Sequence, residues 1–126
     1  MAAAGSAYLA AVDASMPAWQ AIDAMLTANN GDVYRDDLLT QVDADAPFLA
    51  ALVAIQFPPD AAPAANELVA AVQAYDAFLT TEYENFGTYG WYTAQDEQLR
   101  QTRADSSAHL RDVLGLPAST AMLRRP

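Results

Sequence analysis

Alanine is the residue that most limits what this chain can fold into. It supplies 29 of the 126 residues, almost as many as Val, Ile, Leu, Phe and Met together, which supply 30. Alanine has the highest helix propensity and is depleted in strands, so this composition favours helices. Only 17% of the residues are charged and the mean hydropathy is near zero, which predicts a folded domain rather than a disordered chain.

The spacing of the apolar residues predicts four helical segments. They recur at intervals of three and four residues, and Gly, Asn and Pro clusters separate the segments. The expected segments run from Ser6 to about Ala28, from Asp32 to about Gln56, from Asp60 to Phe86, and from Thr93 to a helix stop at Gly115. Helices of this length joined by short turns predict an all-α fold, an up-down-up-down antiparallel four-helix bundle. In the second segment we expect these residues to be buried: Leu38, Val42, Leu49, Leu52 and Val53.

The same pattern sets the expected domain limits. Residues 1–6 are expected to be a leader or disordered, residues 7–117 to form the bundle, and residues 118–126 to be a flexible tail. The longest strongly apolar run, residues 48–57, is too short to span a bilayer, so the chain is not predicted to be transmembrane. Residues 1–6 also lack the basic and apolar regions of a signal peptide.

Charge is distributed unevenly along the chain. The net charge is −10, and residues 1–98 carry 14 acidic residues but only one basic residue, Arg35. Residues 99–126 carry five arginines and two acids. Phosphate backbones and anionic membranes repel such an acidic chain, so no nucleic-acid partner is predicted. We expect the basic segment to pair with acidic residues inside the same fold.

Missing residue types exclude several kinds of chemistry. The chain has no cysteine, which excludes disulfides, thiolate nucleophiles and iron–sulfur clusters. It has no lysine, which excludes a P-loop lysine and a Schiff-base amine. A single histidine, His109, excludes the H-E-x-x-H zinc motif and the paired Glu-x-x-His motifs of di-iron bundles. No cofactor is predicted.

Two prolines fall inside predicted helices. Pro17 and Pro47 would each bend a helix and free a backbone carbonyl four residues earlier, at Asp13 and Asp43. These carbonyls, together with the carboxylates of Asp13, Asp43 and Asp45, are candidate ligands for a hard cation such as Ca²⁺. Two alternatives, which we favour because no ligand-rich loop is present, are that water satisfies the carbonyls or that Ser15 starts a new helix with Pro17 in its first turn.

An aromatic segment surrounds the glycines at positions 87 and 90. Aromatic rings with polar tips on a glycine-containing loop would suit a stacking platform for a sugar or a peptide. The alternative, which we favour, is that these rings fill the end of an alanine-rich bundle. The candidate ligand-binding residues are Tyr83, Phe86, Tyr89, Trp91 and Tyr92.

Acidic residues near His109 suggest acid–base chemistry. Asp105, His109 and Asp112 share one helical face, which would suit a general base, but an exposed ion pair explains them better because no nucleophile lies beside them. The acid pairs at 36–37 and 82/84 would suit a glycosidase, but solvated helix faces explain them equally. We therefore predict that the protein is not an enzyme.

Three short segments resemble a known group of proteins. These are the run from Tyr8 to Val12 followed by Pro17, the Phe57-Pro58 pair leading into Glu67, and the residues from Leu110 to Pro117. They resemble the alanine-rich helical secreted proteins and lipoproteins of high-GC bacteria, which are mostly of unknown function. The resemblance implies a cell-envelope or extracellular location if an export signal was removed, and a cytoplasmic one otherwise.

Two functions fit these observations. The first is a non-catalytic helical binding or interaction module that meets a protein partner or forms a homodimer. The second is a binder of a small molecule or glycan that uses the aromatic segment from Tyr83 to Tyr92.

Overall fold

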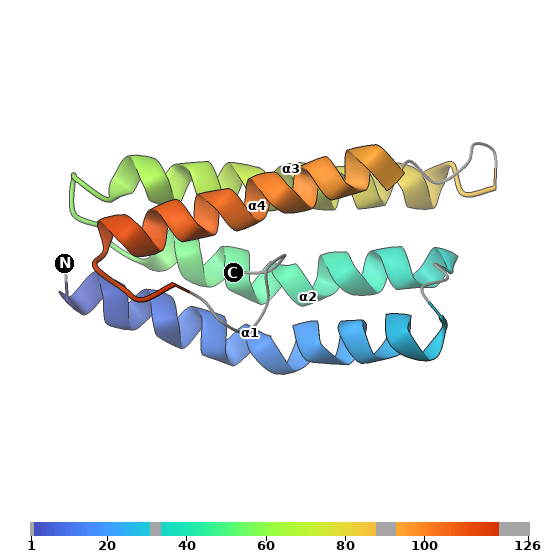
Figure 1. Cartoon of the computed structure of the whole chain (residues 1–126), viewed down its shortest axis with the longest axis horizontal. Coiled ribbons are helices and arrows are strands. Elements are labelled where there is room, and N and C mark those ends of the chain that lie inside the picture. Colours follow the sequence, from blue (N-terminus) through green and yellow to red (C-terminus); the bar gives the residue numbers. More distant parts are fainter. Residues whose placement is uncertain (1, 31–33, 88–92, 119–126) are drawn as a thin grey trace.

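Four helices account for the regular structure of the chain. The computed structural model describes residues 2–30, 34–87 and 93–118. Within them lie α1 (Ala2–Ala28), α2 (Arg35–Ala54), α3 (Ala62–Glu84) and α4 (Thr93–Val113). Consecutive helices run in opposite directions and pack side by side (Figure 1). The predicted all-α, up-down-up-down four-helix bundle is therefore confirmed.

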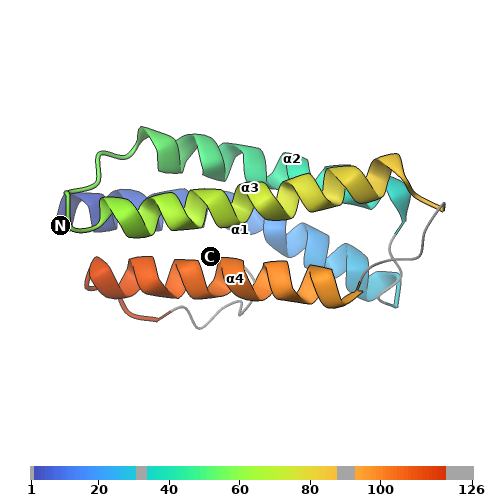
Figure 2. The ribbon, with the colours of Figure 1, turned by 90° about the horizontal axis from the view of Figure 1, so that it is seen from above.

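The four helices surround a common core, with the closest packing between α1 and α2, α2 and α3, and α3 and α4. In Figure 1, α3 lies above α1, and in Figure 2, which is turned by 90°, α2 and α4 lie on either side of them. Thus α1 faces α3 across the bundle, and α2 faces α4. A contact between α2 and α4 must therefore cross the centre of the molecule.

Local signals explain where α2 and α3 begin. The carboxylate of Asp37 accepts a hydrogen bond from the backbone N–H of Tyr34 at 3.1 Å, which is the carboxylate half of a capping box at the start of α2. Pro63 lies in the first turn of α3, where its missing N–H has no cost. The expected cap Asp32 lies outside the described residues, and α3 begins two residues after the expected cap Asp60.

The start of α1 packs against the residues that follow α4. Gly115 has a positive φ of 72°, and the N–H of Leu116 binds the carbonyl of Arg111 at 2.8 Å, so the predicted glycine stop of α4 is confirmed. The Leu116 side chain then lies against Gly5. The first helix begins at Ala2, ahead of the expected start at Ser6, and Ala4 and Gly5 are buried in this contact.

The helices continue through both internal prolines. Pro17 lies inside α1 and Pro47 inside α2, and both rings are exposed. Figure 1 shows the direction of α1 changing near its middle, as expected from a proline that removes one backbone hydrogen bond.

Two apolar clusters fill most of the interior. The larger lies towards the end of the bundle that holds the N-terminus and includes Tyr8, Trp19 and Phe48, whose rings meet edge to face. The smaller lies towards the other end and contains Leu38, Tyr75, Phe78 and Leu79. Small residues complete the contact face of α3, where these alanines are buried: Ala64, Ala65 and Ala71.

The prediction that Val53 is buried was wrong. Its side chain is 72% exposed, whereas Leu38 and Leu52 are buried and Val42 and Leu49 are half-buried. The buried face of α2 contains Leu38, Asp45 and Leu52 at seven-residue intervals. Val53 follows Leu52 by one residue, a rotation of about 100°, and therefore points away from the core.

Candidate functional site

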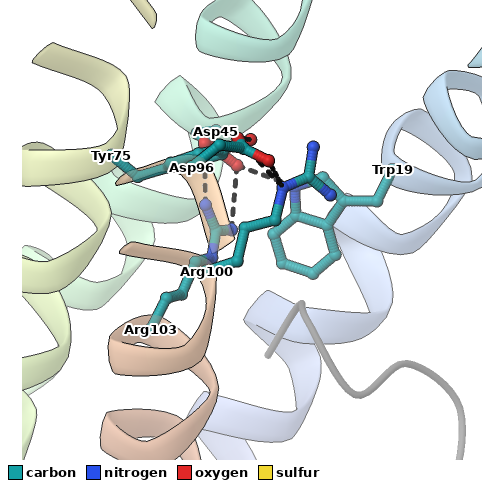
Figure 3. Close-up of polar contacts among 6 residues, drawn as sticks. All are labelled: Trp19, Asp45, Tyr75, Asp96, Arg100 and Arg103. Carbon is teal, nitrogen blue, oxygen red and sulfur yellow. Dashed lines mark hydrogen bonds and ion pairs between the residues drawn. The ribbon is translucent and has the colours of Figure 1, made fainter. Parts of the chain in front are cut away.

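A single buried carboxylate on α2 binds side chains of α1 and α4. Asp45 on α2 is 0% exposed and accepts two hydrogen bonds from Arg103 on α4, at 2.8 and 2.9 Å. It also accepts one from Nε1 of Trp19 on α1, at 2.9 Å. Figure 3 shows Trp19 and Arg103 converging on Asp45. We call Asp45, Trp19 and Arg103 the central polar layer.

The Asp45–Arg103 ion pair has short distances and two parallel hydrogen bonds. Arg103 is 1% exposed and binds both carboxylate oxygens, which is the bidentate arrangement that a guanidinium favours. Its guanidinium carbon also lies 5.5 Å from the ring centre of Trp19. Burial raises the pKa of Asp45, but the hydrogen bonds and the charge of Arg103 and the hydrogen bond from Trp19 hold it below its ordinary value. Asp45 is therefore ionised at neutral pH.

A second polar contact lies between α3 and α4. Tyr75 on α3 donates its hydroxyl to Asp96 on α4 at 2.8 Å, and Arg100 pairs with the same carboxylate at 3.0 Å. Arg100 also lies over the Tyr75 ring, at 5.4 Å from its centre (Figure 3). This contact joins α3 to α4 one turn from the central polar layer.

A third polar contact joins α1 to α4. The hydroxyls of Tyr8 and Ser107 are 2.8 Å apart, and Arg111 lies over the Tyr8 ring at 5.5 Å. Burial raises the pKa of Tyr8, although Ser107 and Arg111 partly oppose this, so the phenol remains protonated at neutral pH. The inner face of α4 is thus largely polar, and its polar side chains lie against aromatic rings of α1 and α3.

The expected pairing of the basic segment with the acidic remainder is confirmed for Arg103. All four arginines among the described residues lie over an aromatic ring, including Arg35, which lies 4.2 Å from the ring centre of Tyr83. The sequence signal was the row of arginines on the fourth predicted segment. It did not indicate which of the 16 acids each would meet, because Asp45 and Arg103 are 58 positions apart.

The candidate cation ligands do not converge. Asp13 and Asp43 are exposed on the outer faces of α1 and α2, whereas Asp45 points inward to Arg103. Across residues 2–30, 34–87 and 93–118, no group of three or more His, Asp and Glu side chains is placed to hold a metal ion.

Two of the five aromatic candidates lie in the described part of the chain. Tyr83 is half-buried beneath Arg35, whose Nε also donates to the Tyr83 carbonyl at 3.1 Å. Phe86 is exposed, and so is Tyr34, which lies at the same end of the bundle because α2 begins where α3 ends. Tyr89, Trp91 and Tyr92 lie outside the described residues.

His109 is exposed, as expected, but the carboxylate that it contacts belongs to another helix and not to its own helical face. Its Nδ1 lies 3.1 Å from a carboxylate oxygen of Glu67 on α3. Asp105, which shares its helical face, instead accepts a hydrogen bond from Gln101 at 2.8 Å. The contact is more than half exposed on both sides and is therefore worth little to stability.

The outer face of α1 carries a continuous row of small apolar residues that we did not predict as a site. The row follows alternating steps of four and three residues along the whole helix, and its members are exposed except for the half-buried Ala7. A polar row at seven-residue steps, Ser6, Asp13, Gln20 and Thr27, runs beside it. We call the following residues the alanine seam: Ala3, Ala7, Ala10, Ala14, Pro17, Ala21, Ala24 and Ala28.

The period of the seam is that of a helix-pairing surface. Steps of four and three give a mean of 3.5 residues, the repeat with which two helices supercoil around each other. The 3.5-residue spacing of these alanines is visible in the sequence, but the same spacing is equally consistent with a buried helix face. Only the inward position of Tyr8, Trp19 and Ile22 shows that the seam faces outward.

The molecule is thus an all-α four-helix bundle with a charged interior and one alanine-lined outer helix. No family model matches the chain, and neither a curated protein nor a solved structure matches it. Among the described residues, no helix is sufficiently long and apolar to cross a bilayer.

Proposed function

We propose that this protein is a non-catalytic helical interaction module that self-associates through the alanine seam of α1. The observation that carries the proposal is the seam itself, an exposed apolar face with a 3.5-residue period over a helix of 27 residues. Small side chains allow two helix backbones to approach closely, which brings many weak van der Waals contacts into range.

The distribution of charge favours a second copy of the chain as the partner. Two copies of a protein with a net charge of −10 repel each other, and this electrostatic repulsion is smallest where acidic residues are sparse. The first helix carries only two acids, Asp13 and Asp23, and Asp23 is half-buried. The outer face of α2 carries Asp36 and Asp43, and that of α4 carries several acids and amides.

The interior supports binding rather than catalysis. Asp45 and Arg103 are buried and bonded to each other, and Asp96 is bonded to Tyr75 and Arg100. Charged groups engaged in this way tie helices together and are not presented to a substrate. The location in the cell envelope stays a prediction from the sequence resemblance.

Light scattering across a range of protein concentrations tests the proposal. The wild-type mass should double as concentration rises, whereas Ala14→Glu, which puts a charge in the middle of the seam, should keep the protein monomeric. The matched control is Ala70→Glu, an equally charged change at an exposed alanine on α3, which should still double. A wild-type chain that stays monomeric throughout, or variants that behave alike, would overturn the proposal.

The second candidate function is the binding of a small molecule or glycan at the aromatic end. Exposed Tyr34 and Phe86 beside the Arg35–Tyr83 pair favour it, because exposed rings near a cation can stack on a sugar. Calorimetric titration with a panel of oligosaccharides should then give heats that disappear in Phe86→Ala. An absence of heat with every wild-type titration would remove this candidate.

A further inference from the structure

Arg111, in the last turn of α4, is a buried cation that lacks a carboxylate partner. It is 7% exposed. Arg100 and Arg103, earlier on the same helix, each pair with an aspartate. Among residues 2–30, 34–87 and 93–118, no carboxylate forms an ion pair with Arg111. A guanidinium buried without an opposite charge is costly, so an anion that reached it would be bound favourably.

The contacts that Arg111 does make supply no full negative charge. Its Nη1 donates to the backbone carbonyl of Pro117 at 3.2 Å, and its guanidinium lies over the ring of Tyr8. The carbonyls at the end of α4 carry partial negative charge, but those of the last turn already accept the N–H groups of Gly115 and Leu116. The Nε–H of Arg111 is buried and has no acceptor in the described part of the chain.

A hydroxyl pair beside Arg111 holds a further donor. The hydroxyls of Tyr8 and Ser107 are 2.8 Å apart, and both residues are buried. Each hydroxyl has one proton, so the bond between them uses one proton and leaves the other for a further acceptor. Ser107 precedes Arg111 by four residues and therefore lies on the same face of α4. Donors of two kinds thus lie together in the interior.

We propose that Arg111 and the Tyr8–Ser107 hydroxyl pair form a binding site for a small carboxylate. The bond to Pro117 uses Nη1, which leaves the guanidinium edge formed by Nε and Nη2 for two parallel bonds to the two oxygens of a carboxylate. The remaining hydroxyl proton supplies a third bond. Pro117 is exposed, so the guanidinium that touches its carbonyl lies directly beneath the surface.

Charge and geometry favour a carboxylate over a phosphate. A protein with a net charge of −10 repels a divalent anion more strongly than a monovalent one. The inner face of α4 also binds carboxylates elsewhere, since Arg103 holds both oxygens of Asp45 in the same two-bond arrangement. A small ligand is required because Tyr8 and Arg111 are both buried.

Titration of labelled wild-type protein with sodium acetate at neutral pH tests the proposal through the arginine Nε–H signals in NMR spectra. The Arg111 signal, assigned through bonds from its backbone amide, should shift and saturate, whereas sodium chloride at equal ionic strength should not move it. The Nε–H of Arg103 is also buried without an acceptor among the described residues, but Asp45 meets its charge, so its signal should stay constant. An Arg111 signal that acetate does not move, or that only phosphate moves, would overturn the proposal.

Urea unfolding measures the same binding as a gain in stability. Acetate at about ten times its Kd should lower the wild-type unfolding constant about elevenfold relative to chloride at equal ionic strength. Arg111→Lys keeps the charge but loses the paired N–H donors, so its response to acetate should be lost. Arg100→Lys, the same change at an arginine that already has a carboxylate, is the control and should respond as wild type does. Equal responses of the two variants would contradict the assignment of the site to Arg111.

Discussion

At the scale of single residues, two aspartates only two positions apart have opposite roles. Asp43 is exposed, while Asp45 lies at the centre of the bundle, because two residues along a helix correspond to a rotation of about 200°. From the sequence alone, both residues were candidate cation ligands. Knowing which face of α2 is buried would have separated them, and the position of Leu38 and Leu52 defines that face.

Removing the central carboxylate should be far more damaging than removing its neighbour. Asp45→Ala leaves Arg103 buried without its partner, and we expect a loss of about 3–5 kcal/mol in the free energy of unfolding. Asp43→Ala changes the net charge equally but should alter stability by no more than about 0.5 kcal/mol. Urea unfolding measures both, and similar losses for the two variants would show that the central polar layer is not a major source of stability.

The stability supplied by Asp45 should also be lost in acid. Its pKa is lowered in the folded state, so its contribution is present above the ordinary carboxyl range and declines as the pH falls through the lowered value. Between about pH 5 and 2, wild type should lose more stability than Asp45→Asn, which has no carboxylate to protonate. Thermal unfolding at several pH values measures this, and parallel profiles would contradict it.

At the scale of the helices, α4 differs from the other three. Its inner face contains Asp96, Arg103, Ser107 and Arg111, where a bundle helix ordinarily presents apolar residues. The existence and approximate ends of α4 were predictable, because helix propensity, Thr93 and Gly115 are local signals. Its polar contacts were not, since each depends on a residue that only the folded chain brings near.

Replacement of the proline inside α1 should stabilise the protein. Pro17 is exposed and costs the helix one hydrogen bond, so Pro17→Ala should raise the free energy of unfolding by about 1–3 kcal/mol. The bend in α1 should decrease at the same time. Thermal unfolding gives the change in stability, and a lower melting temperature would mean that the bend is needed for packing.

At the scale of the whole molecule, the fold class was predictable from the sequence, whereas the surface that we propose for self-association was not. Alanine content and a 3.6-residue apolar period are enough to specify a helical bundle. Alanine occurs on buried and on exposed helix faces, so its positions do not indicate which face of a helix points outward. On α1 both an inward and an outward row keep helical spacing, and the large residues Tyr8 and Trp19 determine which row is core. The seam on the opposite face is the surface that we propose for self-association.

Dilution of isotope-labelled protein, followed by backbone amide NMR, tests most directly the central claim that α1 presents the working surface. As the protein is diluted, the amide signals of α1 seam residues such as Ala10, Ala14 and Ala21 should shift, while those of exposed α4 residues should stay constant. Spectra that do not change with concentration, or shifts confined to the end of the bundle near Tyr34 and Phe86, would contradict the claim.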